Sequence, residues 1–113
     1  VKEERLDIIF RALSDSTRRG ILSEVAKGDP TVGEIGRPFS ISGPAISKHL
    51  KVLERAQLVT RIREGTTNRF RLNMDPFREV DQAIRQLTAF WQKRLDAIAE
   101  IVENNMEDTN NDK

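Results

Sequence analysis

The sequence predicts a mainly α-helical domain with one small β-hairpin, in the order α-α-α-α-β-β-α. Three observations lead to this fold class. An amphipathic helix is expected over residues 42–55, two arginine-rich segments with alternating β-branched residues follow at 58–63 and 69–72, and a heptad-like apolar stripe begins after Pro76. With 113 residues, the chain has the length of one domain with a modest core.

Composition narrows the possible functions. The chain has no cysteine and no tyrosine, and it has one histidine. Disulfides, thiolate metal sites and cysteine nucleophiles are therefore excluded. No glycine-rich phosphate loop is present, so an enzyme is not expected. No run of about 18 apolar residues predicts a membrane span, and no secretory signal is visible at the N-terminus. We therefore expect a cytoplasmic protein without a membrane partner.

The net charge of +1 hides an asymmetry. Residues 1–73 hold 14 Lys/Arg against 9 Asp/Glu, whereas residues 74–113 hold 5 against 9. Within the first part, residues 48–71 alone carry 7 basic and 2 acidic side chains. Such a positive strip is typical of a nucleic-acid-binding surface, although a solvated basic face on an unrelated domain gives the same count.

The first two expected helices are short. The first covers residues 3–13, and Ile8 falls on a different side of it from four apolar residues at helical spacing. These four residues are Leu6, Ile9, Phe10 and Leu13. Residues 14–16 supply caps for a second helix, which should end near Gly28.

A third helix and a tight turn precede the helix over residues 42–55. Thr31 and Glu34 have capping-box spacing, and Pro38 should end the short helix that they begin. Ser42 is the expected N-cap of the next helix. A short helix, a tight turn and a longer helix with a polar outer face form the helix-turn-helix pattern.

The helix over residues 42–55 has two different faces. At about 100° per residue, one side holds Ile46, Leu50 and Leu53, and the other holds Pro44, Ser47, Lys48, Lys51 and Arg55. A small, hydroxylated and cationic face suits a helix against DNA phosphates with base edges in reach, although an ordinary surface helix has the same pattern. His49 lies near the centre of the apolar side, so we expect a hydrogen-bonded, part-buried histidine and not a metal ligand.

The segments at 58–63 and 69–72 predict a β-hairpin whose five-residue connector, 64–68, contains Gly65. A hairpin beside a DNA-contacting helix is a wing, whose side chains reach phosphates or the minor groove. A plain ribbon that closes the core is the alternative. The candidate DNA-binding residues are Thr31, Ser42, Gly43, Pro44, Ser47, Lys48, Lys51, Arg61, Arg63, Thr66, Thr67, Asn68 and Arg69.

The last element is a long helix with Asp75 as N-cap and Pro76 in the first position. Two rows of apolar residues repeat every seven positions, with Arg94 interrupting the second: Phe77, Ile84, Trp91 and Ile98, then Val80, Leu87 and Ile101. A domain of this size leaves such a stripe uncovered, so we expect a second copy; folding back onto the first helix is the alternative. The candidate dimer-interface residues are Leu6, Ile8, Ile84, Leu87, Trp91, Leu95 and Ile98.

The domain is therefore expected to cover residues 1–104, with a dimerisation helix over about 75–104 and a disordered tail at 105–113. A pocket for a small apolar effector beside Phe90 and Trp91 is a further alternative for part of the stripe.

Four segments together resemble the ArsR family of small bacterial winged-helix repressors: FRALSDSTRR at 10–19, VGEI at 32–35, PAISKHLKVLE at 44–54 and LV at 58–59. The resemblance covers residues 5–100. It implies a homodimer, joined through the first and last helices, that represses transcription from a palindromic operator in double-stranded DNA. It also implies that helix 42–55 lies in the major groove and that the hairpin is a wing.

The resemblance implies recognition positions at Ser42, Gly43, Pro44, Ser47 and Lys48, where many relatives have glutamine in place of the glycine. The metal sites of the family do not transfer. The thiolate site needs cysteines within residues 32–39, and the last helix has no histidine. That helix does hold carboxylates, namely Asp75, Glu79 and Asp81. Zinc or arsenic sensing and a cofactor are therefore not expected. A winged helix that binds protein remains the alternative, against which the positive strip argues.

Overall fold

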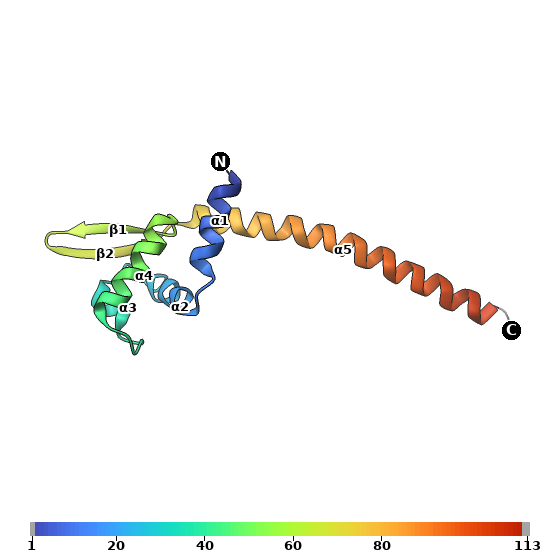
Figure 1. The fold of residues 1–113 in the computed structure, drawn as a ribbon, viewed down its shortest axis with the longest axis horizontal. Helices are drawn as coiled ribbons and strands as arrows, with labels where there is room; N and C mark the ends of the chain where they lie inside the picture. The colour runs from blue at the N-terminus through green and yellow to red at the C-terminus, as the bar shows by residue number, and fades with distance from the viewer. Residues whose placement is uncertain (1, 112–113) are drawn as a thin grey trace. The chain divides into compact units, whose positions relative to one another are not determined.

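The computed structural model describes residues 2–111, and the chain divides into two units, residues 1–80 and 81–113. The first unit holds α1 (Lys2–Leu13), α2 (Ser16–Val25), α3 (Val32–Gly36), α4 (Gly43–Arg55), β1 (Val59–Glu64) and β2 (Thr67–Leu72) (Figure 1). α5 (Met74–Asn111) begins in the first unit and supplies the described residues of the second. The predicted class, mainly helical with an antiparallel two-stranded hairpin, is confirmed.

Side-chain caps begin the three inner helices where the sequence predicted them. Asp15 accepts a hydrogen bond from the backbone N–H three residues later, at 3.0 Å, and starts α2. Thr31 does the same for α3 and Ser42 for α4, each at 3.2 Å. The Glu34 carboxylate accepts from the Thr31 hydroxyl at 3.2 Å. These bonds satisfy backbone donors that a helix leaves free in its first turn.

The core lies in the first unit and is apolar. No polar or charged residue is buried among the residues that the structure describes. Phe70 of β2 is the largest of the fully buried side chains, and it fixes the hairpin to the helices. The buried residues of the hydrophobic core cluster are Ile9, Ala12, Ile21, Leu22, Val25, Ile35, Ile46, Leu50, Leu53, Ala56, Leu58, Val59, Phe70 and Val80.

α1 buries a narrower stripe than predicted. Ile9 and Ala12 are fully buried, and Leu6 packs half-buried against the core. Phe10, predicted to share that face, is 40% exposed, and Ile8 is 45% exposed. Both residues are one position from Ile9, which places them about 100° away around the helix.

The hairpin turn is shorter than the predicted five-residue connector. Glu64 pairs directly with Thr67, so only Gly65 and Thr66 lie in the turn. Gly65 has a φ of 59°, and Thr66 is not among the described residues with positive φ. Glycine at the first of two turn positions is typical of a type II′ hairpin turn.

α5 differs from its prediction at both ends. It begins at Met74, one residue before the predicted cap, and the Asp75 carboxylate instead accepts from Arg78 at 3.0 Å. The helix continues to Asn111, so residues 105–111 are helical where the sequence predicted disorder. No glycine or proline follows Pro76 to stop it. Residues 112–113 of the predicted tail lie outside the described residues.

The junction between α4 and β1 is a Schellman motif. Gln57 has a φ of 60°, in the left-handed region. Its N–H donates to the carbonyl of Glu54 at 2.9 Å, and the N–H of Leu58 donates to the carbonyl of Leu53 at 3.0 Å. Leu53 and Leu58 are both fully buried in the same core cluster, as expected for the apolar pair that accompanies this motif. The chain therefore leaves α4 in one fixed direction.

Replacing Gln57 by glycine should stabilise the first unit. A left-handed conformation costs a residue with a Cβ about 1 kcal/mol, and glycine avoids that cost. We expect Gln57→Gly to raise the free energy of unfolding by about 0.5–1 kcal/mol in urea melts. Gln57→Ala is the control and should change it little, because alanine keeps the strained Cβ. Equal melts for the glycine and alanine variants would contradict this account of the junction.

Candidate nucleic-acid interface

α4 turns its polar face to solvent. Ile46, Leu50 and Leu53 are at most 1% exposed, which fixes the rotation of the helix against the core. α3 packs beside it (Figure 1). On the opposite face Gly43, Pro44, Lys48, Lys51 and Arg55 are exposed, and Ser47 is half-buried. An added Cβ at Gly43 would meet nothing within 4 Å, so this end of the helix is open to a partner.

The cations on this face have no internal partner. Among the described side chains, Lys48, Lys51 and Arg55 form no hydrogen bond or ion pair. The same holds for Arg37, the exposed C-cap residue of α3, within the described part of the chain. Sequence reasoning missed Arg37, because a single arginine before Pro38 carries no pattern. Cations of this kind are available to neutralise phosphates.

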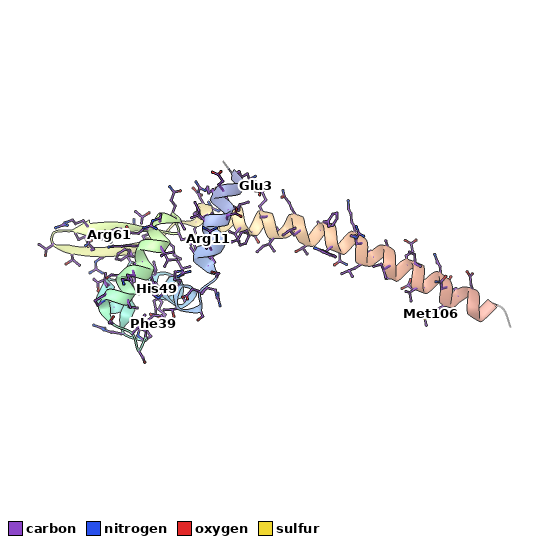
Figure 2. The ribbon with its side chains drawn as sticks, viewed as in Figure 1. Glu3, Arg11, Phe39, His49, Arg61 and Met106 are labelled. Atoms are coloured by element: carbon purple, nitrogen blue, oxygen red, sulfur yellow. The ribbon has the colours of Figure 1, made fainter. Side chains whose placement is uncertain are left out.

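Arg61, in contrast, serves the fold. Its Nη2 donates to Glu54 Oε1 at 2.8 Å, and its guanidinium lies 5.3 Å from the centre of the Phe70 ring. Figure 2 shows Arg61 on the hairpin. The side chain therefore ties β1 to the C-terminal end of α4 and covers the aromatic anchor of the hairpin.

Arg69 is also committed to internal contacts. Its Nε donates to Glu64 Oε2 at 2.9 Å and its Nη1 donates to the Asp29 carbonyl at 3.1 Å. Arg71 donates to the Asp29 carboxylate at 2.6 Å, and this hydrogen bond, together with the positive charges of both arginines, lowers the pKa of Asp29. The backbone N–H of Phe70 donates to the Pro30 carbonyl at 3.0 Å. β2 is thus docked on the loop between α2 and α3.

Arg63 is the hairpin arginine that remains available. Its Nε donates to the Gly65 carbonyl at 3.1 Å, within the turn itself. The side chain is exposed and stands opposite Asn68 in the strand register. Thr66 and Thr67 are exposed beside it, and Asn68 is half-buried. The tip of the hairpin therefore presents one cation, two hydroxyls and an amide.

The hydroxyls predicted at Thr31 and Ser42 are used as helix caps. Thr31 also forms a β-bridge with Arg69, which places it between α3 and the hairpin. These two hydroxyl groups position the helices, so a hydrogen bond from either one to a partner has to be made in addition to the cap.

His49, labelled in Figure 2, is half-buried. Its Nδ1 lies 3.5 Å from Nη1 of Arg18. Arg18 Nε donates to the carbonyl of Ala12 at 2.7 Å, so this arginine bridges the end of α1 and α4. The same residue also contacts the cap of α2: the backbone N–H of Arg18 donates to the Asp15 carboxylate and thereby lowers the pKa of Asp15. The expected part-buried position of His49 is confirmed, and Arg18 is the hydrogen-bonding partner within reach of its ring.

The carboxylates near the start of α5 are paired with arginines. No group of three or more His, Cys, Asp or Glu side chains is arranged to hold a metal ion in the described part of the chain. Asp75, Glu79 and Asp81 accept from Arg78, Arg5 and Arg85 respectively, at 2.9–3.0 Å. Within residues 2–111, no helix is both long and apolar enough to cross a membrane.

Comparison with known proteins identifies the arrangement. Residues 13–62 match the family described as "Helix-turn-helix domain". The chain is 38% identical over 104 residues to the HTH-type transcriptional regulator Rv2034 of Mycobacterium tuberculosis, and the match covers 91% of this chain and 94% of that protein. An ArsR-like transcriptional regulator from Rhodococcus sp. RHA1 has a TM-score of 0.75 at 31% identity, over 88% of this chain and 93% of that chain. The chain belongs to the ArsR family of winged helix-turn-helix transcriptional regulators.

The ArsR family consists of DNA-binding regulators and not of enzymes, so the predicted class of function is confirmed. A further relative, the transcriptional repressor SdpR of Bacillus subtilis, is 43% identical over 65 residues, or 58% of this chain and 72% of that protein. In ArsR-family terms, α4 is the recognition helix and the β1–β2 hairpin is the wing.

The second unit carries the apolar stripe of this ArsR-family chain. Phe77 and Val80, at the start of α5, pack on the core of the first unit. From Ile84 to Met106 the apolar side chains are about half exposed or more, and Trp91 is 59% exposed. The further residues of the stripe are Leu87, Phe90, Leu95, Ile98, Ile101 and Val102. Such a continuous exposed apolar face marks an interaction surface.

Two arginines of the wing should respond differently to alanine substitution. Arg63→Ala should weaken binding to any duplex and lower the salt slope by about one unit for each phosphate that is no longer neutralised. Arg61→Ala should leave the salt slope unchanged and instead lower the urea midpoint of unfolding, because Arg61 joins Glu54 and Phe70. Fluorescence anisotropy at several salt concentrations measures the slopes. A lower slope for Arg61→Ala and an unchanged one for Arg63→Ala would reverse the two assignments.

Proposed function

We propose that this ArsR-family regulator is a homodimeric repressor that binds a palindromic operator in the cytoplasm. The observation that carries the proposal is the exposed face of α4, where, within the described residues, Lys48, Lys51 and Arg55 are unpaired while the opposite face is buried. A cation without a carboxylate partner can replace the counterions of DNA phosphates. The relative from B. subtilis is named a repressor, which supports repression as the outcome.

The recognition helix and the wing have different tasks in this proposal. The first turns of α4 enter the major groove, where Ser47 and Lys48 reach base edges. Lys51 and Arg55 follow along the same face and contact phosphates. At the wing tip, Arg63 and its neighbours contact the backbone or the adjacent minor groove. The proposed DNA contacts are Gly43, Pro44, Ser47, Lys48, Lys51, Arg55, Arg63, Thr66, Thr67 and Asn68.

Pairing of the two copies rests on α5 and α1. The apolar stripe from Ile84 to Val102 is too large to leave in water, and a second copy has the same stripe to offer. Ile8 of α1 is exposed, and Leu6 is half-buried, so α1 adds a smaller apolar patch. Two linked DNA-binding units bind more tightly than one, because the first unit, once bound, holds the second at a high effective concentration near the DNA.

The proposal predicts a two-fold symmetric footprint. We expect duplexes selected by the protein from a random-sequence library to contain inverted repeats whose centres lie about one or two helical turns apart, at about 34 Å per turn. Hydroxyl-radical footprinting of a selected duplex measures the protected positions, and binding should weaken steeply with salt. A single asymmetric half-site would contradict the dimeric mode. A dimer that binds no duplex at low salt would favour the protein-binding alternative.

Trp91 should matter for DNA affinity without contacting DNA. Truncating a buried aromatic anchor costs about 3–5 kcal/mol. Trp91→Ala should therefore give monomers in sedimentation velocity at micromolar concentration and weaken binding to the selected duplex. Lys93→Ala, an exposed position beside it on α5, is the matched control and should stay dimeric. A Trp91→Ala protein that is dimeric with normal DNA affinity would overturn the anchor role. If it were dimeric but had lost a response to an apolar effector, the pocket alternative would be favoured.

A further inference from the structure

Asn73 connects three segments that meet at the base of the wing. Its side-chain amide donates to the carbonyl of Gln57 at 2.9 Å, and its side-chain carbonyl accepts from the Thr60 hydroxyl at 2.8 Å. Its backbone N–H donates to the carbonyl of Leu58 at 3.0 Å. One residue thus contacts the exit of α4, the start of β1 and, through the chain itself, the first residue of α5.

The group that Asn73 holds is the strained part of the junction. Gln57 is the left-handed residue that ends the recognition helix, with a φ of 60°. Its carbonyl lies outside the helical hydrogen bonds of α4, and the Asn73 amide supplies the donor. The Thr60 hydroxyl fixes the other end of the same amide, so the amide group cannot rotate without breaking a bond.

The surroundings leave this contact accessible to water. Asn73 is half-buried and lines an open cleft of about 630 Å³, together with Gln57 and Thr60. Water can therefore solvate the partners of the side chain when that side chain is removed, which limits the decrease in global stability. Asn73 is not a member of the apolar core cluster that contains Phe70. The Asn73 side chain therefore contributes mainly to the orientation of β1 relative to α4, and little to the burial of apolar surface.

We propose that Asn73 is a positioning residue for DNA binding, which fixes the angle between the recognition helix and the wing. The proposal rests on the proposed function, because that angle matters only if α4 and the wing bind one duplex together. A dimer has to place two such pairs on one DNA, and a loosely held wing dissociates from the duplex first. The rest of the interface can still bind through Lys48, Lys51 and Arg55.

Double-mutant cycles test the proposal, with affinity measured on a duplex that the wild-type protein has selected. Asn73→Ala should lower affinity for that duplex about tenfold, the equivalent of one or two net hydrogen bonds, and Thr60→Val should lower it less. Arg63→Ala should have little further effect in the Asn73→Ala background, because a wing held at a changed angle no longer presents Arg63 to its phosphate. Lys48→Ala, the control on α4, should have its full effect in both backgrounds. Circular dichroism and titration of the active fraction exclude unfolding as the cause.

The outcomes separate the two proposals. If the effects of Asn73→Ala and Arg63→Ala on DNA affinity were additive, Asn73 would act only on stability and the inference would be overturned. The same conclusion would follow if the decrease in affinity merely matched the decrease in the folded fraction. Failure of the wild-type protein to select any duplex would instead remove the proposed function.

A measurement without DNA tests the positioning role of Asn73 whether or not the protein selects a duplex. The chain has no cysteine, so Lys51→Cys and Thr66→Cys allow nitroxide labels on α4 and on the wing tip alone. The labelled protein is diluted in unlabelled protein, and pulsed electron paramagnetic resonance measures the distance between the two labels. We expect one narrow distance distribution in the parent and a broader one with Asn73→Ala. An unchanged distribution would refute the positioning role.

Discussion

The left-handed conformation of Gln57 is the constraint on which the interface depends. Two backbone hydrogen bonds and the buried contact between Leu53 and Leu58 hold the chain in that conformation at the end of α4. The buried face of α4 fixes how the helix rotates, and the junction fixes where β1 goes. Together they place α4 and the β1–β2 hairpin side by side in one surface, and the burial of Phe70 packs the hairpin onto the same core.

Ion pairing then decides which cations that surface presents. Residues 48–71 carry seven basic side chains. Arg61, Arg69 and Arg71 pair with Glu54, Glu64 and Asp29, so their charges serve to dock the hairpin. The cations that remain for a partner are Lys48, Lys51, Arg55 and Arg63. The proposed surface for DNA is therefore smaller than the net charge indicates, and its cations lie along α4 and at the wing tip. Exposed pairs of this type add little stability individually, but they set geometry.

The order of elements and the three caps could be predicted because they depend on local spacing: Asp15, Thr31 and Ser42 each stand before an apolar repeat. The turn at Gly65 was predicted too long, since polar residues such as Thr67 and Asn68 carry no sign of strand pairing. The roles of Asn73 and Asp29 could not be predicted, because their partners lie 13 to 42 residues away in the sequence. A net charge count likewise cannot tell Arg61 from Arg63.

The spacing of the α5 stripe also explains the interruption at Arg94. The apolar residues from Ile84 run through Leu87, Trp91, Leu95, Ile98 and Val102, so two consecutive steps of four follow a step of three. That stretch is an eleven-residue repeat set between heptads, a spacing that would locally unwind a left-handed supercoil between two such helices. Leu95 thereby takes the place in the stripe that a strict heptad would give to Arg94. At about 100° per residue, Arg94 falls next to Leu87, between the row from Ile84 to Val102 and the outer pair Phe90 and Ile101. Its guanidinium lies 5.8 Å from the centre of the Phe90 ring. The charge thus borders the row from Ile84 to Val102, which stays continuous, and separates that row from Phe90 and Ile101.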